Sequence, residues 1–203
     1  MPPAADYRAL RILMAPELPA GIVEHIDRVV AVTAELAQRH GIDVSRALLA
    51  AQGHDLLRAM PPEALLEAAA LRGLDVSALE RAQPVLLHGP LGAVELERRG
   101  WVTDAEALHA IYWHTTGHPD FGPSAWAMFI ADKVEPAKLL RWPALEAVSE
   151  LAEDSLEEAA LLYLALNRRK ATREGWEPHP MAEVTRKALR QQAGARHRPR
   201  AGA

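Results

Sequence analysis

Apolar residues recur at helical spacing along most of this 203-residue chain. Alanine and leucine dominate, aromatic residues make up only 5% of the chain, and runs of β-branched residues are scarce. This composition favours helix over strand, because Ala and Leu lose little conformational freedom in a helix. The sequence therefore predicts an all-α fold with no strand and no internal repeat.

Start and stop signals divide the chain into predicted helices. Gly41 is placed to end the first strong helix, Asp43 to cap the next and Pro84 to begin a later one. Two capping boxes, at 103–106 and 155–158, indicate further helix starts. The predicted helices cover residues 22–40, 43–59, 63–71, 84–99, 103–113, 123–134, 155–166 and a short segment after 180.

The length of the chain favours one domain, because domains commonly contain about 100–200 residues. No linker long enough to separate two domains is visible. We expect a lead-in segment at 1–19, one domain over 20–190, and a basic tail at 191–203 that is disordered.

Composition excludes several classes of protein. The chain contains no cysteine, which removes disulfides, thiolate zinc sites, iron–sulfur clusters and a cysteine nucleophile. A net charge of −4 argues against a general nucleic-acid binder, which would need a strongly basic face. No apolar run approaches the roughly 20 residues of a membrane helix, and the N-terminus lacks a signal-peptide core. We therefore expect a cytoplasmic protein without a membrane or nucleic-acid partner.

The sequence contains nine histidines, which are its most unusual chemical feature. One imidazole on an apolar helix face is usually a packed side chain bonded to a backbone carbonyl. Several buried imidazoles and carboxylates on different helices are harder to explain, since each is costly unless it is paired or coordinated. Helical bundles build metal sites from such inward-facing side chains. The residues in question are His25, His54, Asp55, His88, His114 and Asp132.

The donor atoms of these six residues indicate which metals they could bind. Imidazole nitrogen and carboxylate oxygen without sulfur suit iron, manganese, zinc or similar divalent ions. Four histidines and two aspartates exceed the needs of one open site and are a natural complement for two ions. Two ions about 3.5–4 Å apart bridge a hydroxide and bind a phosphoryl oxygen, as in phosphate ester and anhydride hydrolysis.

The order of these residues resembles that of the HD-domain metal-dependent phosphohydrolases. Three further motifs are similar to those of the YqeK family, whose members are bacterial symmetric hydrolases of diadenosine tetraphosphate. The resemblance extends from about residue 20 to 190. The motifs are LHGPLGA at 87–93, WHTTG at 113–117 and IADKVEP at 130–136.

The resemblance implies a single compact HD-domain helical fold with a dinuclear metal site between helices. It implies two divalent metal ions, usually iron, with manganese or zinc as the other candidates. By position, the first ion would be held by His25, His54, Asp55 and Asp132. Asp55 would bridge to the second ion, which His88 and His114 would complete. The implied reaction is the symmetric cleavage of diadenosine tetraphosphate, a small-molecule nucleotide, into two ADP by a monomer or homodimer.

Basic residues near this set are candidates to bind substrate phosphate. Arg58 lies one helical turn after His54, where members of the family have a basic residue, and a planar guanidinium suits bidentate phosphate contacts. Lys133 and Lys138 are the other two candidates.

Two residues keep two interpretations each. The predicted catalytic residues are Asp55, Arg58 and His118. His118 would bind phosphate or act as a general acid. A solvated loop histidine is an equal alternative. Glu135 is either a partner that orients a histidine or a solvated helix end.

The chain departs from the family pattern on the substrate side. Ile26 stands where Ser or Thr is usual, and His118 and Lys138 each replace an Arg. The nucleotide is therefore open, and another nucleotide or phosphate ester is an alternative. Two readings from other classes also stay open, a di-iron oxygenase on an HD scaffold and a non-catalytic nucleotide sensor. Oxygen uptake by the reduced protein separates an oxygenase from a hydrolase, and metal analysis with a turnover assay tests the sensor.

Overall fold

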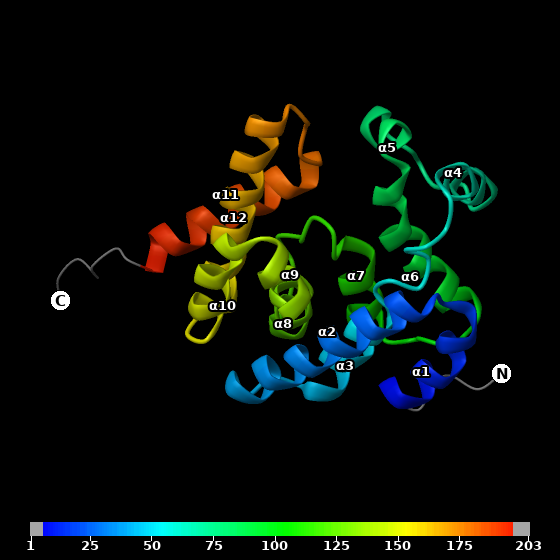
Figure 1. The fold of residues 1–203 in the computed structure, drawn as a ribbon, viewed down its shortest axis with the longest axis horizontal. Helices are drawn as coiled ribbons and strands as arrows, with labels where there is room; N and C mark the ends of the chain where they lie inside the picture. The colour runs from blue at the N-terminus through cyan, green and yellow to red at the C-terminus, as the bar shows by residue number, and fades with distance from the viewer. Residues whose placement is uncertain (1–5, 197–203) are drawn as a thin grey trace.

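Helix α8 (Pro123–Val134) lies at the centre of the computed structural model, which describes residues 6–196. Every α8 residue from Ser124 to Val134 is buried, as expected for a helix that is covered on all sides. The helices that contact it (Figure 1) are α2 (Ala20–Arg39), α3 (Val44–Gly53), α7 (Ala105–Trp113), α9 (Pro136–Arg141), α10 (Glu146–Ala152) and α11 (Leu156–Glu174).

The other helices form the two sides of the molecule in Figure 1. On one side a smaller apolar cluster joins α4 (Pro62–Leu71), the 3₁₀ helix η2 (Pro84–Leu87) and α6 (His88–Arg98), with α5 (Ala78–Ala82) against η2. On the other side α12 (Pro180–Arg196) packs on α11. Two more 3₁₀ helices, η1 (Ala15–Glu17) and η3 (Pro143–Leu145), follow α1 (Tyr7–Met14) and α9.

The all-α prediction is confirmed, since the described residues contain helices and no strand. The predicted caps also hold locally. The side chain of Asp43 accepts hydrogen bonds from the backbone of Ser45 and Arg46, and Ser155 accepts one from Glu158. No helix within the described part of the chain is both long and apolar enough to cross a bilayer.

The helix predicted over 43–59 ends earlier, at Gly53. A Cβ at Gly53 would lie 2.7 Å from Ile111 and 2.9 Å from Leu96, so α3 packs tightly against α6 and α7 at this point. Beyond it the chain winds in three-residue turns, with the N–H of Arg58 bonded to the carbonyl of Asp55 at 3.1 Å. His54 and Asp55 therefore lie at the end of a helix instead of inside one.

Other boundaries also differ from prediction. Asp104, not Thr103, caps α7, because its side chain accepts the N–H of Ala107 at 2.8 Å. The lead-in segment 1–19 contains α1, whose Leu10 and Met14 are fully buried in the main core. The last helix is long and includes 191–196, which we expected to be disordered, and the rest of the predicted tail lies outside the described residues. The short helices α5, α9 and α10 were not predicted.

A buried carboxylate, Glu95, ties α6 to its surroundings. Arg98 and Arg99 each donate to it at 2.7 Å, and Arg72 donates at 3.0 Å. Arg99 also donates to Glu17 at 2.7 Å, which links α6 to η1. The hydrogen bond from Arg98 and those from the other two arginines outweigh burial and hold the pKa of Glu95 well below its usual range.

We predict that Glu95→Gln lowers the free energy of unfolding at pH 7 by about 1–3 kcal/mol, because three arginines lose their carboxylate. The native pKa of Glu95 is depressed, so its stabilisation is complete above about pH 5 and shrinks as the pH falls below about 4. Urea unfolding over that pH range measures the difference. Glu97→Gln, an exposed change on the same helix, is the control. A Glu95→Gln effect no larger than that of the control contradicts the prediction.

Candidate metal centre

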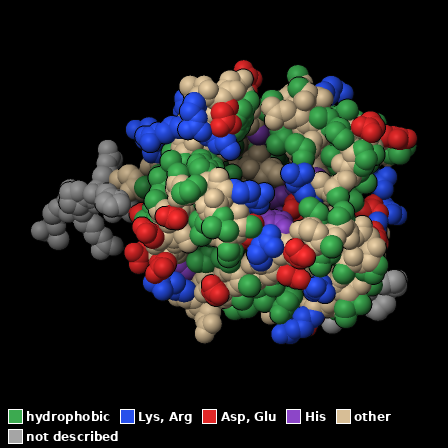
Figure 2. All heavy atoms as spheres, viewed as in Figure 1, with side chains coloured by type: hydrophobic (Ala, Val, Ile, Leu, Met, Phe, Trp, Pro, Cys, Tyr) green, Lys and Arg blue, Asp and Glu red, His purple; other side chains and the backbone are tan. Residues whose placement is uncertain are grey.

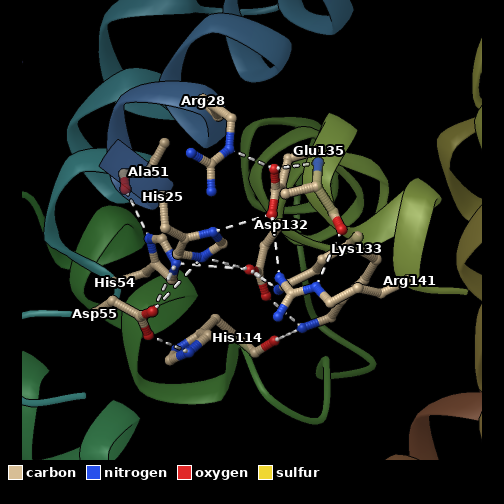
Figure 3. A network of polar contacts seen from close by, with 12 residues as sticks. His25, Arg28, Ala51, His54, Asp55, His114, Asp132, Lys133, Glu135 and Arg141 are labelled. Carbon is tan, nitrogen blue, oxygen red and sulfur yellow. Dashed lines mark hydrogen bonds and ion pairs between the residues drawn. The ribbon is translucent and has the colours of Figure 1, made fainter. Parts of the chain in front are cut away.

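The structure brings the six predicted metal ligands together from five parts of the chain. His25 comes from the middle of α2 and Asp132 from α8, while the others lie at helix ends. All are buried except His25, whose side chain is 12% exposed. Figure 3 shows His25, His54, Asp55, His114 and Asp132 converging on a common point.

Three of the histidines are held by one local device, a hydrogen bond from Nδ1 to the backbone carbonyl three residues earlier. His54 and His114 follow the last residues of α3 and α7, where carbonyls lack helical partners, and His88 follows η2. Because Nδ1 donates in each case, the neutral ring keeps its lone pair on Nε2. The acceptors are Ala51 and Ile111, each at 2.7 Å, and Val85.

His25 lies inside a helix and obtains the same orientation from a distant carboxylate. Its Nδ1 is 3.3 Å from Oε1 of Glu135, and its Nε2 faces Asp132 at 3.2 Å. Glu135 is fully buried and accepts a 2.7 Å hydrogen bond from Arg28, one turn after His25 on α2. The structure thus decides the two interpretations of Glu135, since this residue orients His25 and also caps α9 through the N–H of Ala137.

Asp55 is shared between two groups of ligand atoms. Its Oδ2 lies 3.6 Å from Nε2 of both His25 and His54. Its Oδ1 lies 3.1 Å from Nε2 of His88 and 3.6 Å from that of His114. Each group offers three ligand atoms within 4.8 Å of one another. This is the arrangement in which one carboxylate bridges two ions.

The donor atoms of the site fit a metal better than they fit one another. Nε2 of His54 is buried without a hydrogen-bond partner. Nε2 of His88 and Nε2 of His114 face each other at 2.9 Å, although both rings already donate through Nδ1. Two neutral rings in these tautomers would point lone pairs at each other, which costs free energy unless a cation lies between them.

Both carboxylates of the centre are ionised despite burial. Burial opposes the charge on Asp55, but the adjacent His54 and the close approach of His114 and His88 hold its pKa well below the usual range. Burial likewise opposes the charge on Asp132, and Lys133 and Lys138 lower its pKa well below normal. The Nζ atoms of these lysines lie 2.6 and 2.5 Å from the two oxygens of Asp132.

The two most buried imidazoles have pKa values shifted in opposite directions. Burial lowers the pKa of His114 to about 4, so this ring is neutral at pH 7 and ready to bind a metal. Burial also disfavours the charged form of His54, but the charge of Asp55 and the nearby carboxylate of Asp132 raise its pKa.

Gly89 lets the rings of His88 and His114 approach. A Cβ at Gly89 would lie 2.9 Å from the carbonyl oxygen of Tyr112 and 3.1 Å from the His114 ring. Backbone at that distance cannot move aside easily, so a side chain at Gly89 forces α6 and α7 apart. The second group of ligand atoms depends on this close packing.

The predicted substrate residues have different placements. Lys133 is buried and donates to the carbonyl of His114 at 3.0 Å as well as to Asp132, so it also holds the site together. Arg58 is exposed in the turn that follows Asp55. His118 packs against His109, with ring centroids 4.7 Å apart. Within residues 6–196, no hydrogen bond, ion pair or ring contact joins His118 to the six ligands.

Sequence reasoning did not find Arg28 as part of the site. Arg28 is three residues after His25 on the same helix, so helical spacing was the available signal. That spacing alone does not reveal the partner, because Glu135 is 107 positions away in the chain.

Comparison with known proteins agrees with this geometry. The HD domain family model matches residues 22–137, which include all six ligands. The chain belongs to the HD-domain family. HD domains bind divalent metals, and the two groups of His and Asp side chains are where this chain could hold them.

Among curated proteins, the chain is similar to symmetrical bis(5′-nucleosyl)-tetraphosphatases. It is 33% identical to the protein of that name from Bacillus subtilis over 127 residues, covering 63% of this chain and 67% of the relative. It is 29% identical to the one from Halalkalibacterium halodurans over 157 residues, covering 75% and 80%.

The fold is also that of a solved structure. A protein from Clostridium acetobutylicum, described as a predicted HD superfamily hydrolase involved in NAD metabolism, superposes with a TM-score of 0.84. The match covers 92% of this chain and 97% of the other at 22% sequence identity. This likeness confirms the HD fold over nearly the whole chain.

We predict that Gly89→Ala reduces metal binding, because the new methyl group separates His88 from His114. Metal content per chain, measured by elemental analysis, falls toward one ion or none. Gly92→Ala is a matched control on the same helix, since a Cβ there meets nothing within 4 Å. The control keeps its metal and is expected to be stabilised by up to about 1 kcal/mol through helix propensity. Equal metal content in the two variants contradicts the prediction.

Glu135→Gln is expected to weaken binding of the ion nearest His25 by about 10–100-fold, because a neutral amide holds Arg28 and the His25 ring less firmly. Metal titration of the chelator-treated protein measures this affinity. Glu146→Gln, which changes an exposed glutamate, is the control. Unchanged metal affinity in Glu135→Gln would show that His25 does not need this partner.

Proposed function

We propose that this HD-domain hydrolase cleaves diadenosine tetraphosphate symmetrically into two ADP. The observation on which the proposal depends is the Asp55 carboxylate shared between two groups of ligand atoms. The names of the two relatives described above support the substrate. Two divalent ions are the cofactors we propose. The nitrogen and oxygen donors suit iron, manganese or zinc, and the family resemblance makes iron the first candidate.

Two bound ions would supply an activated water and would neutralise charge on the phosphoryl group that is transferred. The side chains of the protein perform the positioning. Asp55 and Asp132 fix the centre, and the neutral ring of His114 presents its Nε2 without a competing proton. Lys138, whose side chain is 30% exposed, and the exposed Arg58 are the cations that we propose for the substrate phosphates.

Two cavities beside the centre support a substrate with two halves. One, of 240 Å³, is lined by Lys133 and Lys138, which contact Asp132 beside His25 of the first group. The other, of 360 Å³, is lined by Thr115 and Thr116, which directly follow His114 of the second group. Both cavities include Asn167 in their walls. A linear dinucleotide placed across the centre would have room on both sides.

We expect purified, metal-loaded protein to convert diadenosine tetraphosphate to ADP alone, as measured by anion-exchange chromatography of the products. Symmetric attack on an inner phosphorus leaves two identical halves. The formation of ATP and AMP would refute the symmetric reaction and indicate a different arrangement of substrate. No turnover with two ions bound per chain would favour a sensor or another substrate.

Asp55→Ala serves as the inactive variant in this assay. Loss of the shared carboxylate should lower the rate by about three orders of magnitude or more and should reduce metal content, since both groups lose a ligand. Asp75→Ala, which removes an exposed carboxylate, controls for the change in net charge. Retained turnover with full metal occupancy in Asp55→Ala would refute the site assignment.

A further inference from the structure

The cavity of 240 Å³ beside Asp132 differs from the other in its charge. Its walls include four cationic side chains, from Lys133 and Lys138 at the centre to Arg141 at the end of α9 and Lys170 on α11. We call it the cationic cavity. Figure 2 shows histidines at the bottom of a hollow in this face of the molecule, with Lys and Arg side chains close around it.

The positive charge of the cationic cavity is only partly compensated by the protein. Among the described residues, no carboxylate lines it. Lys133 and Lys138 contact the Asp132 carboxylate, which lies behind them in the metal centre. The ammonium of Lys170 instead lies over the Trp142 ring, 4.9 Å from its centroid. Gathering these cations costs free energy, so the cavity is suited to an anion with several charges.

Arg141 is the most accessible of the four cations that line the cationic cavity. Its side chain is 72% exposed, and its Nε donates to the carbonyl of Ala137 at 3.0 Å. The nearest carboxylate oxygen, Oε1 of Glu135, is 3.9 Å away and already faces Nδ1 of His25. The guanidinium therefore keeps donors free for a ligand, and its planar fork suits phosphate oxygens.

Neutral groups on α11 add hydrogen-bonding capacity to the same wall. Burial raises the pKa of Tyr163 to about 12, so its phenol keeps its proton. Asn167 lies one turn further along α11 and borders both cavities. Donors of this kind, set among cations, suit phosphate and ribose oxygens.

We propose that the cationic cavity is the binding site for the diphosphate of one nucleoside diphosphate half of the substrate, with Lys170 and Arg141 as binding residues beyond the metal centre. This inference rests on the proposed function for the place of the scissile bond. A phosphate chain that leaves the centre past Asp132 meets Lys138, which contacts Asp132, and enters the cavity that Lys170 also lines. The other cavity, with Trp176, receives the second half.

The test is calorimetric binding of ADP, inorganic pyrophosphate and adenosine to the metal-loaded protein. Lys170→Ala should weaken binding of ADP and of pyrophosphate by about tenfold or more, because one charge-assisted contact is lost. Arg141→Gln should act in the same direction. Arg169→Ala is the matched control, since it removes a positive charge from the exposed neighbouring position on α11 and should leave binding unchanged.

Metal content and thermal unfolding establish that each variant is folded and loaded. Unchanged ADP binding in Lys170→Ala would overturn the proposal, as would an equal loss in Arg169→Ala. Loss of adenosine binding with pyrophosphate binding intact would show that the cavity holds a nucleoside, which also overturns it. The proposal is also overturned if the native protein binds neither ADP nor pyrophosphate.

These outcomes are independent of turnover. If diadenosine tetraphosphate is not hydrolysed but ADP binding depends on Lys170, the proposed binding site is supported and the proposed reaction is refuted. If the substrate is cleaved to ADP while Lys170→Ala binds ADP and pyrophosphate normally, the proposed reaction is supported and the proposed binding site is refuted.

Discussion

The hydrogen bond made by Nδ1 of each site histidine is the interaction on which the candidate centre depends. Three rings donate to the backbone carbonyl three residues earlier, and His25 is oriented by Glu135. With Nδ1 engaged, the Nε2 atoms point inward around Asp55. Because the rings are already oriented in the protein, these Nε2 atoms would lose little conformational entropy on binding a metal.

The position of Asp132 explains the unusual polarity of α8. This helix is buried from Ser124 to Val134, yet its last turn contains an aspartate and a lysine. The pair is tolerated because Lys133 donates to Asp132 and to the His114 carbonyl, while Lys138 reaches the other oxygen of Asp132. The two lysines that contact Asp132 thus also line the cavity where we propose that phosphate binds.

Local signals predicted several helix starts correctly. Asp43 and Ser155 cap helices as expected, since capping depends on the backbone groups next to the cap in sequence. The end of α3 at Gly53 was missed, because it is set by contact with Leu96 and Ile111 on other helices. The core role of α1 was missed for the same kind of reason, as its buried Leu10 meets residues far along the chain.

The sequence by itself determined the helical class, the order of the six candidate ligands and the restriction to nitrogen and oxygen donors. These are local properties of composition, spacing and side-chain chemistry. The tertiary structure alone decided that the ligands form two groups around Asp55, that Glu135 and Arg28 orient His25, and that His118 packs elsewhere. His25 and Glu135 are 110 positions apart, and such contacts depend on how α2 packs against α8. No spacing along the chain encodes that packing.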